Sequence, residues 1–455
     1  MAKPPIKIIY TTHQFFPYFR AGTELLTYSL ADAMQKKKHC VHIISGFPVR
    51  SAIDSQTAFN EYSYDNLKVY CYYHSSFHPV GNQCVMEAEH NNRIVKRWFK
   101  KLLLDLCPDI VHVFHLKRLS ASILEACREL GIPYVITVTD FWLICPTTQL
   151  LLPNHQLCKG PSKMMVNCAK HLTSLSANPL VYKIADKLPG VLIKSIMYLL
   201  SSQPKLRVGP FANMHSLSLR APYVLQQANN AKRIYVSNQF MRNMLIDHGI
   251  LSKRIKTMPF GIQPLNFASH ELKKVHDVLQ VGFIGTLNHH KGAHIIIKAI
   301  RALPQFENIH LRVYGDRKQF PEYVSMLDNL TVRDPRIEFK GTFPSDQIGK
   351  ILRQFDVLVL PSLWYENTPL ILLQAQAAKL PVIATNLGGM NEIVKNGLNG
   401  FLIEPGDYQK LASILESLIL APEQIPTLRQ NIREPMFIDQ YADMLEEEYR
   451  EIVGR

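Results

Sequence analysis

The sequence lacks any apolar run long enough to cross a membrane. The best candidate, residues 188–200, is interrupted by Pro189, Gly190 and Lys194, whereas a spanning helix needs about 20 apolar residues. Near the N-terminus the apolar run is only Ile8–Tyr10, and a secretory signal needs a core of about 7–15 apolar residues. We therefore expect a cytoplasmic protein, with peripheral contact to the inner face of a membrane left open.

Cysteine is absent beyond residue 168, and acidic residues are in deficit. All eight cysteines lie within the first 168 residues, and a disulfide-stapled secreted protein would be denser in cysteine.

Basic residues outnumber acidic residues. Lys plus Arg number 51 against 37 Asp plus Glu, a formal net charge of +14. This balance favours polyanionic partners such as phosphates or an anionic membrane, although it also simply favours solubility. No nucleic-acid motif accompanies the charge, so we expect no nucleic-acid partner.

The remaining composition is that of a globular chain. Of 455 residues, 47% are hydrophobic and 19% charged, which excludes a disordered chain, a collagen and a coiled coil. The length suits two large α/β domains or about three smaller domains.

Short β-branched runs alternate with amphipathic helical patterns, which predicts parallel βαβ units in doubly wound sheets. In the first half we expect strands at 6–10, 41–45, 110–114, 134–137, 233–236 and 255–258. In the second half we expect strands at 278–284, 310–314, 336–340, 357–360, 381–384 and 401–403. The fold class is therefore α/β, with two Rossmann-like domains.

The predicted domain boundaries follow this alternation. We assign 1–258 to an N-terminal domain, with an irregular insertion at 150–230. A linker at 259–276 leads to a C-terminal domain at 277–432. The final segment, 433–455, is expected to be a helix that packs back on the N-terminal domain.

The segment Pro361–Glu404 carries the most informative chemistry. Glu366 follows a predicted strand and precedes a helix that opens at Leu370. Amides at a helix start bind anions, and a neighbouring carboxylate can orient hydroxyl groups. A lone Glu at this place would more simply be an acidic cap.

This segment resembles the donor-sugar site of the retaining GT-B glycosyltransferases (family 4, group 1). The shared residues are Pro361, Ser362, Glu366, Pro381, Val382, Ala384, Gly388, Gly389, Glu392, Asn396, Gly397 and Gly400. The resemblance implies two domains facing across a cleft, with 1–258 on the acceptor side and 277–432 as the nucleotide-sugar-binding domain. It also implies hexosyl transfer, with retention of configuration, from a nucleotide sugar to a glycan or lipid-linked acceptor. It makes Glu366 a catalytic residue that holds donor-sugar hydroxyls, and the donor-binding set then includes Asn367, Thr368, Pro369 and Leu370.

The loop Gly285–Gly292 resembles the family's phosphate-binding loop. Lys291 falls on the diphosphate-binding Lys, while Thr286 replaces the family's Arg and loses its bidentate fork. Gln374 replaces the Glu that holds the ribose, and its amide can still accept and donate hydrogen bonds. We expect a UDP- or GDP-linked donor and no cofactor for catalysis, because Lys291 and helix-start amides can stabilise the leaving diphosphate.

The first half resembles the same family less completely. Gly22 lies in a loop whose backbone is expected to approach the diphosphate. The segment 139–146 matches the family's H-D-x-W-x-x-C-P pattern except for Thr139 in place of His, and we assign Asp140 to the catalytic residues. His13 and His115 follow predicted strands and are acceptor-side candidates, although each is more simply a structural residue.

Two further features have competing interpretations. Cys145, Cys158, Cys168 and His171 could form a structural zinc site with tetrahedral ligands, or they could be unrelated thiols or a disulfide. Residues 179–207 combine aliphatic residues with lysines, which suits either an anionic membrane interface or a packed insertion.

Thr139, Thr286 and Gln374 differ from the residues that the family has at these positions. An alternative function is therefore that of a weakly active or inactive subunit that binds nucleotide sugar or glycan. A nucleotide-sugar epimerase on a related fold is another alternative.

Overall fold

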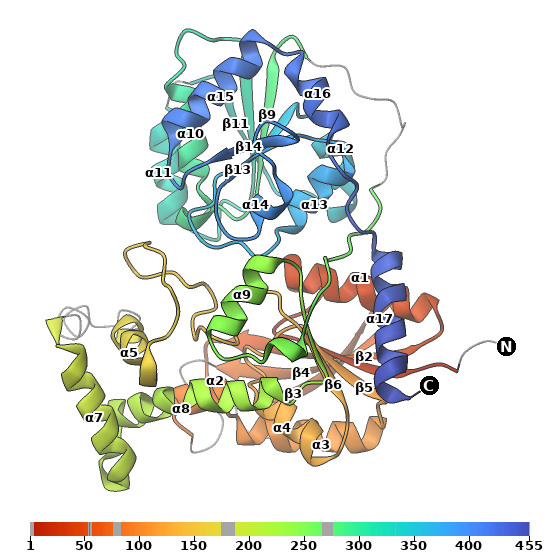
Figure 1. Cartoon of the computed structure of the whole chain (residues 1–455), viewed down its shortest axis with the longest axis vertical. Coiled ribbons are helices and arrows are strands. Elements are labelled where there is room, and N and C mark those ends of the chain that lie inside the picture. The colour runs from red at the N-terminus through yellow and green to blue at the C-terminus, as the bar shows by residue number, and fades with distance from the viewer. Residues whose placement is uncertain are drawn as a thin grey trace. The chain divides into compact units, whose positions relative to one another are not determined.

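The computed structural model describes residues 4–52, 54, 57–75, 83–173, 187–265, 276–332 and 334–454. The chain forms two compact units, each built on its own sheet (Figure 1). The first unit comprises residues 1–237, 242–259 and 439–455, and the second comprises 238–241 and 260–438. Most of the predicted linker, 266–275, lies outside the described residues.

The first unit contains an eight-stranded sheet in the order β3-β4-β2-β1-β5-β6-β7-β8, parallel except for the β3–β4 pair. Its strands are β1 (Lys7–Thr12), β2 (Cys40–Val49), β3 (Phe59–Tyr64), β4 (Leu67–Ser75), β5 (Ile110–Val113), β6 (Tyr134–Thr137), β7 (Arg233–Val236) and β8 (Ile255–Thr257). The central strands are buried along almost their whole length, which is typical of parallel sheets covered on both faces.

The helices of this unit include the last helix of the chain. They are α1 (Gly22–Lys36), α2 (Val85–His90), α3 (Arg93–Leu106), α4 (Ser122–Glu129), α5 (Val166–Thr173), α7 (Gly190–Ser202), α8 (Pro210–Asn229), α9 (Gln239–Asp247, its first residues in the second unit) and α17 (Ile438–Val453). Short 3-10 turns lie at Lys163–Met165, Pro204–Leu206 and Ser252–Arg254. In α17, the buried Tyr449 hydroxyl contacts Nδ1 of His112 on β5. Residues 439–455 therefore belong to the first unit, whereas 433–438 belong to the second.

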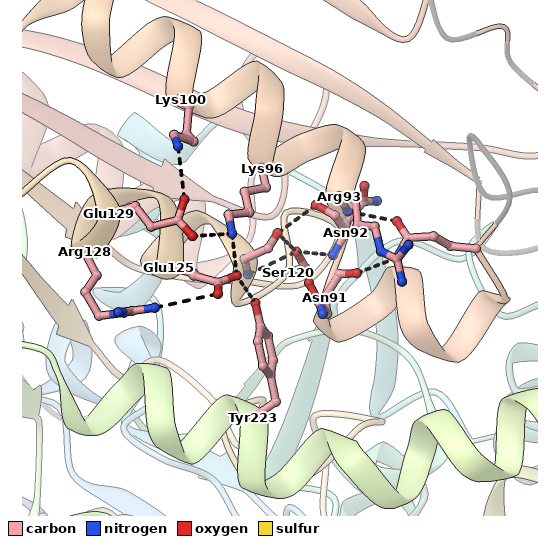
Figure 2. A network of polar contacts seen from close by, with 12 residues as sticks. Asn91, Asn92, Arg93, Lys96, Lys100, Ser120, Glu125, Arg128, Glu129 and Tyr223 are labelled. Atoms are coloured by element: carbon pink, nitrogen blue, oxygen red, sulfur yellow. Dashed lines mark hydrogen bonds and ion pairs between the residues drawn. The ribbon is translucent and has the colours of Figure 1, made fainter. Parts of the chain in front are cut away.

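A polar network ties α3, α4 and α8 together (Figure 2). The Lys96 ammonium lies 2.8 Å from Glu125 and 2.6 Å from Glu129. The oxygen of Glu125 that Lys96 contacts, Oε2, also accepts from the Tyr223 hydroxyl at 3.0 Å. The C-terminal half of α8, within the predicted insertion, is thereby fixed to the body of the first unit.

The second unit contains a six-stranded parallel sheet in the order β11-β10-β9-β12-β13-β14. Its strands are β9 (Leu279–Ile284), β10 (Ile309–Tyr314), β11 (Ile337–Gly341), β12 (Val357–Leu360), β13 (Val382–Thr385) and β14 (Gly400–Ile403). Its further helices are α10 (Ala293–Arg301), α11 (Pro321–Thr331), α12 (Ile348–Leu352), α13 (Leu370–Ala377), α14 (Met390–Ile393), α15 (Tyr408–Leu420) and α16 (Gln424–Gln430), with 3-10 turns at His289–Lys291 and Ser345–Gln347. Two separate apolar clusters form its core.

The predicted fold class of two parallel-sheet α/β domains is confirmed. No helix among the described residues is long and apolar enough to cross a membrane.

Candidate functional site

In the second unit, a lysine and a glutamate meet beyond the carboxyl ends of two neighbouring strands. Lys291 ends the turn that follows β9, and Glu366 lies in the loop between β12 and α13. Because β9 and β12 pair in parallel, their carboxyl ends share one edge of the sheet, where ligands of such folds bind. The Lys291 ammonium donates to Oε1 of Glu366 at 2.6 Å.

The same carboxylate oxygen accepts two further hydrogen bonds. The Ser362 hydroxyl and the indole N–H of Trp364 each donate to Oε1 of Glu366 at 2.8 Å. Nζ of Lys291 also lies 5.1 Å from the centre of the Trp364 ring, within the range of a cation–π contact. Glu366 is thus held in one orientation by its own loop and by Lys291.

Electrostatics keep this carboxylate ionised. Burial of Glu366 opposes ionisation, but the Lys291 charge and the hydrogen bonds from Lys291, Ser362 and Trp364 outweigh it, so the pKa of Glu366 lies below its usual value. At neutral pH the carboxylate is therefore negatively charged, and it can accept hydrogen bonds from hydroxyl groups.

Glycine backbones allow this close arrangement. Gly292 follows Lys291 with a φ of +76°, and a Cβ there would lie 2.0 Å from the carbonyl oxygen of Pro361. Gly388 has a φ of +66°, and a Cβ there would lie 2.3 Å from the carbonyl oxygen of Glu366. The loop after β13 therefore packs directly behind the Glu366 backbone, and the amide of Gly389 donates to the Glu366 carbonyl at 2.8 Å.

The residues after Glu366 are held by Asn238, which belongs to the second unit. Its side-chain amide donates to the Asn367 carbonyl at 2.8 Å and to the Thr368 hydroxyl at 3.0 Å. Pro369 then caps α13, which begins at Leu370 as the sequence predicts.

The other donor candidates lie on three different elements. Thr286 is half-buried just beyond β9, and Gln374 is half-buried within α13. Gly22 starts α1 in the first unit.

The first unit has its own polar cluster, at the carboxyl ends of β1, β5 and β6. Nε2 of His115 lies 2.6 Å from Oδ2 of Asp140. The backbone amide of Lys117 donates to Nδ1 of His115 at 3.0 Å, so the neutral imidazole carries its proton on Nε2 and donates to Asp140. Oδ1 of Asp140 accepts from the backbone amide of Trp142 at 2.8 Å, and a small pocket is lined by both His115 and Asp140.

His13 adjoins this cluster and contacts a fully buried carboxyl group. The His13 and His115 rings lie 4.2 Å apart between centres, and Nε2 of His13 lies 3.3 Å from Glu24. Burial raises the pKa of Glu24. Burial, together with electrostatic interaction with His115, Arg118 and Lys117, lowers the pKa of His13. Both changes favour an uncharged pair.

The zinc site expected from Cys145, Cys158, Cys168 and His171 is not formed. Among the described residues, which include these four, no three His, Cys, Asp or Glu side chains come together so as to hold a metal ion. Cys145 contacts the Thr147 hydroxyl at 3.2 Å, and Cys168 lies in an apolar cluster where burial raises its thiol pKa to about 12. The three cysteines are free thiols, so they form no disulfide with one another.

Trp364, Asn238 and Glu24 were not predicted from the sequence to be members of these clusters. The spacing from Ala21 to Glu24 was an available signal, since Glu24 accepts from the Ala21 amide at 2.8 Å in a capping arrangement. The contact from Asn238 crosses 129 residues and leaves no local pattern.

Comparisons with known proteins show which families the two halves of the chain resemble. Residues 266–434 match the family model described as glycosyl transferases group 1, and residues 20–178 match glycosyltransferase family 4. The amylovoran biosynthesis glycosyltransferase AmsK of Erwinia amylovora is 26% identical over 218 residues, which cover 44% of this chain and 53% of that protein. An Escherichia coli UDP-Gal:alpha-D-GlcNAc-diphosphoundecaprenol alpha-1,3-galactosyltransferase is 47% identical over 70 residues, covering 15% of this chain and 18% of that protein.

The match to the AmsK relative thus spans about half of that protein's length. Among solved structures, Anabaena HepE in complex with UDP is 16% identical with a TM-score of 0.64, covering 98% of this chain and 100% of that chain. Sucrose-phosphate synthase of Thermosynechococcus elongatus is 15% identical with a TM-score of 0.64, covering 99% of both chains. These likenesses support the GT-B fold.

Proposed function

We propose that this chain, a group 1 glycosyltransferase with the GT-B fold, moves a hexosyl group from a UDP- or GDP-linked sugar to a glycan or lipid-linked acceptor, with retention of anomeric configuration. The observation that carries the proposal is the Lys291–Glu366 pair at the carboxyl ends of β9 and β12. The names of relatives add support, since one acts with UDP-Gal on a diphosphoundecaprenol acceptor and another is a glycosyltransferase of amylovoran biosynthesis.

Lys291 and Glu366 have different tasks in this proposal. The positive charge of Lys291 stabilises the diphosphate as negative charge develops on the leaving group. Glu366 is ionised and is held by three hydrogen-bond donors. It accepts hydrogen bonds from the hydroxyl groups of the donor sugar. Gln374 and Thr286 contact the nucleotide, and the start of α13 offers backbone amides to an anion.

The environment of Glu366 also supports retention without a protein nucleophile. A carboxylate with a lowered pKa and three hydrogen bonds to one oxygen is a poor base and a poor nucleophile. The acceptor oxygen then attacks the sugar carbon on the face from which the diphosphate departs. The carbon–oxygen bond to the diphosphate breaks, and the acceptor proton passes to the departing phosphate oxygen.

The cluster of His13, His115 and Asp140 is proposed to bind the acceptor. Asp140 orients His115, because it accepts the Nε2 proton at 2.6 Å. Both ring nitrogens of His115 are used by Asp140 and the Lys117 amide. The Asp140 carboxylate, which lines the small pocket of the first unit together with His115, is then the group that accepts hydrogen bonds from acceptor hydroxyl groups, and His13 lies against the His115 ring.

The experiment is a screen of UDP- and GDP-linked hexoses with polyprenyl-diphosphate sugars and soluble oligosaccharides as acceptors. Released nucleoside diphosphate is quantified, and the anomeric configuration of the product is read by NMR. The proposal expects acceptor-dependent release and a product with the configuration of the donor. An inverted product refutes retention. Tight nucleotide-sugar binding without transfer to any acceptor supports the rival binding subunit, and conversion of free nucleotide sugar without acceptor supports an epimerase.

A further inference from the structure

Helix α7 exposes apolar side chains on the face that does not pack on the protein. Its residues Ile193, Met197 and Leu200 are buried, and the first two join an apolar cluster with Cys168 and Leu217. On the remaining surface Val191 is 76% exposed and Tyr198 is 70% exposed. A helix that is apolar on all sides normally has a covering partner on each side, and α7 is too short to cross a membrane.

The exposed apolar surface continues beyond α7 into the start of α8. We define the α7–α8 face as the exposed large apolar residues of this region, Val191, Leu192, Tyr198, Leu199, Leu206, Val208, Phe211 and Leu219. Surface patches of this kind mark interaction sites on soluble domains. Figure 1 shows α7 projecting away from the sheet of the first unit, beyond the far end of α8.

The charged residues in the segment 187–229, which contains α7 and α8, are all basic. Lys187, Lys194 and Lys205 are exposed beside the apolar residues, and the sequence from Phe141 to Ile246 contains Asp186 as its only acidic residue. A second copy of the chain would present the same positive surface and repel it. An apolar face bordered by lysines is instead complementary to a bilayer with anionic headgroups.

The face is mounted firmly on the body of the first unit. The Arg207 guanidinium donates to the carbonyls of Leu200 and Ser201, each at 2.7 Å, and so fixes the turn after α7. In α8, Arg220 donates to the Trp142 carbonyl at 2.5 Å, and Tyr223 contacts Glu125 (Figure 2). Binding through this face would therefore hold the whole first unit at a surface.

We propose that the α7–α8 face docks this chain on an anionic lipid surface, with Val191, Tyr198, Leu199 and their apolar neighbours inserted at the interface and the lysines on the headgroups. This inference goes beyond the transfer reaction and does not depend on the acceptor. A lipid-linked acceptor would nevertheless lie within reach of a protein docked in this way.

The test is flotation of the full chain with vesicles of phosphatidylcholine alone or mixed with phosphatidylglycerol. The wild type should bind only the mixed vesicles, and less at high salt, because screening weakens charge attraction. Reversal of three lysines, in K187E/K194E/K205E, should weaken binding about a hundredfold. The matched control K253E/K298E/K350E changes the net charge equally on exposed lysines elsewhere and should bind as the wild type does.

A second pair of variants tests insertion. V191S/Y198S/L199S should lose most of its vesicle binding, whereas L104S/V332S/L420S, at comparably exposed positions, should retain it. UDP affinity, measured by calorimetry, should be equal in all variants, which separates this proposal from the proposed function. Equal binding by both charge variants, or no binding by the wild type at low salt, would overturn the proposal. So would a dimer in solution that only V191S/Y198S/L199S dissociates, since the face would then be covered by a second copy.

Discussion

The ammonium of Lys291 lies 2.6 Å from a carboxylate oxygen of Glu366, across 75 residues of sequence. The two side chains come from loops after β9 and β12, strands that pair in parallel. The ordinary geometry of a parallel sheet thus brings to one edge the cation that we propose binds phosphate and the anion that we propose binds sugar hydroxyl groups.

Replacing Lys291 with Ala should weaken UDP or GDP binding by roughly ten- to a hundredfold, because a charge-assisted contact to the diphosphate is lost. The change also removes the main partner of Glu366, so the pKa of that carboxyl should rise. Calorimetric titration of nucleotide measures the affinity. Lys298→Ala, at an exposed position on the following helix, is the control. Equal affinities in the two variants would place the diphosphate elsewhere.

Gly388→Ala should disturb the Glu366 loop, since a Cβ there would lie 2.3 Å from the Glu366 carbonyl oxygen. Nucleotide-sugar affinity should fall at least about tenfold if the loop shifts by a fraction of an ångström. Gly397→Ala is a close control, because Gly397 also has a positive φ, +74°, but no atom lies within 4 Å of the added carbon.

The control variant should lose about 1 kcal/mol of stability through backbone strain while nucleotide binding is kept. Equal affinity losses in the two alanine variants would show that strain, and not contact with the Glu366 loop, is responsible.

More of the fold than of the candidate site could be predicted from the sequence. The central strands were recognisable because each is a short apolar run, and their observed bounds lie within a few residues of the predicted ones. The β3–β4 hairpin was not predicted, because β3 has the sequence FNEYSY and is mostly exposed or half-buried. Its aromatic residues pack through side chains, as with Phe59 against Trp98 at 4.7 Å between ring centres, which no periodicity reveals.

In the site, Lys291 and Glu366 could be located because each follows a predicted strand. Their contact with each other and with Trp364 depends on side-chain orientation, which local sequence does not encode. For the cysteines, spacing left a zinc site and unrelated thiols open. Among the described residues no three His, Cys, Asp or Glu side chains come together so as to hold a metal ion, and Cys168 lies in an apolar cluster.

Glu24→Gln should leave the first unit at least as stable as the wild type at neutral pH. The pKa of Glu24 is raised in the folded protein, so the folded state binds more protons than the unfolded state, and stability falls as pH rises above about 4.3. Gln mimics the protonated acid and has no such dependence. The stability of the variant relative to wild type should therefore increase between about pH 4 and pH 7.

Chemical denaturation at several pH values measures this difference, with the nucleotide-insensitive transition taken as that of the first unit. If the stability of Glu24→Gln relative to the wild type decreased as pH rises, the folded protein would be shown to stabilise Glu24 as a carboxylate.

Asp140→Asn should lower turnover while leaving nucleotide affinity unchanged. Asp140 accepts the His115 Nε2 proton through one oxygen and the Trp142 amide through the other. An amide has a single acceptor oxygen, so one of these donors must lose its partner, at a cost of about 1–3 kcal/mol. Asp109→Asn, before the opposite end of β5, serves as the control for a general loss of charge. Unchanged kcat in Asp140→Asn would remove this cluster from the acceptor site.

The most direct test of the central claim is the transfer rate of Glu366→Gln measured beside its affinity for the free nucleoside diphosphate. A Gln has nearly the same size and keeps one acceptor oxygen, but it lacks the charge that holds the sugar hydroxyls and pairs with Lys291. The account predicts a loss of kcat of at least about a hundredfold, with nucleoside diphosphate affinity changed much less than kcat. A variant that transfers sugar at the wild-type rate would contradict the assignment of Glu366 as the residue that orients the donor.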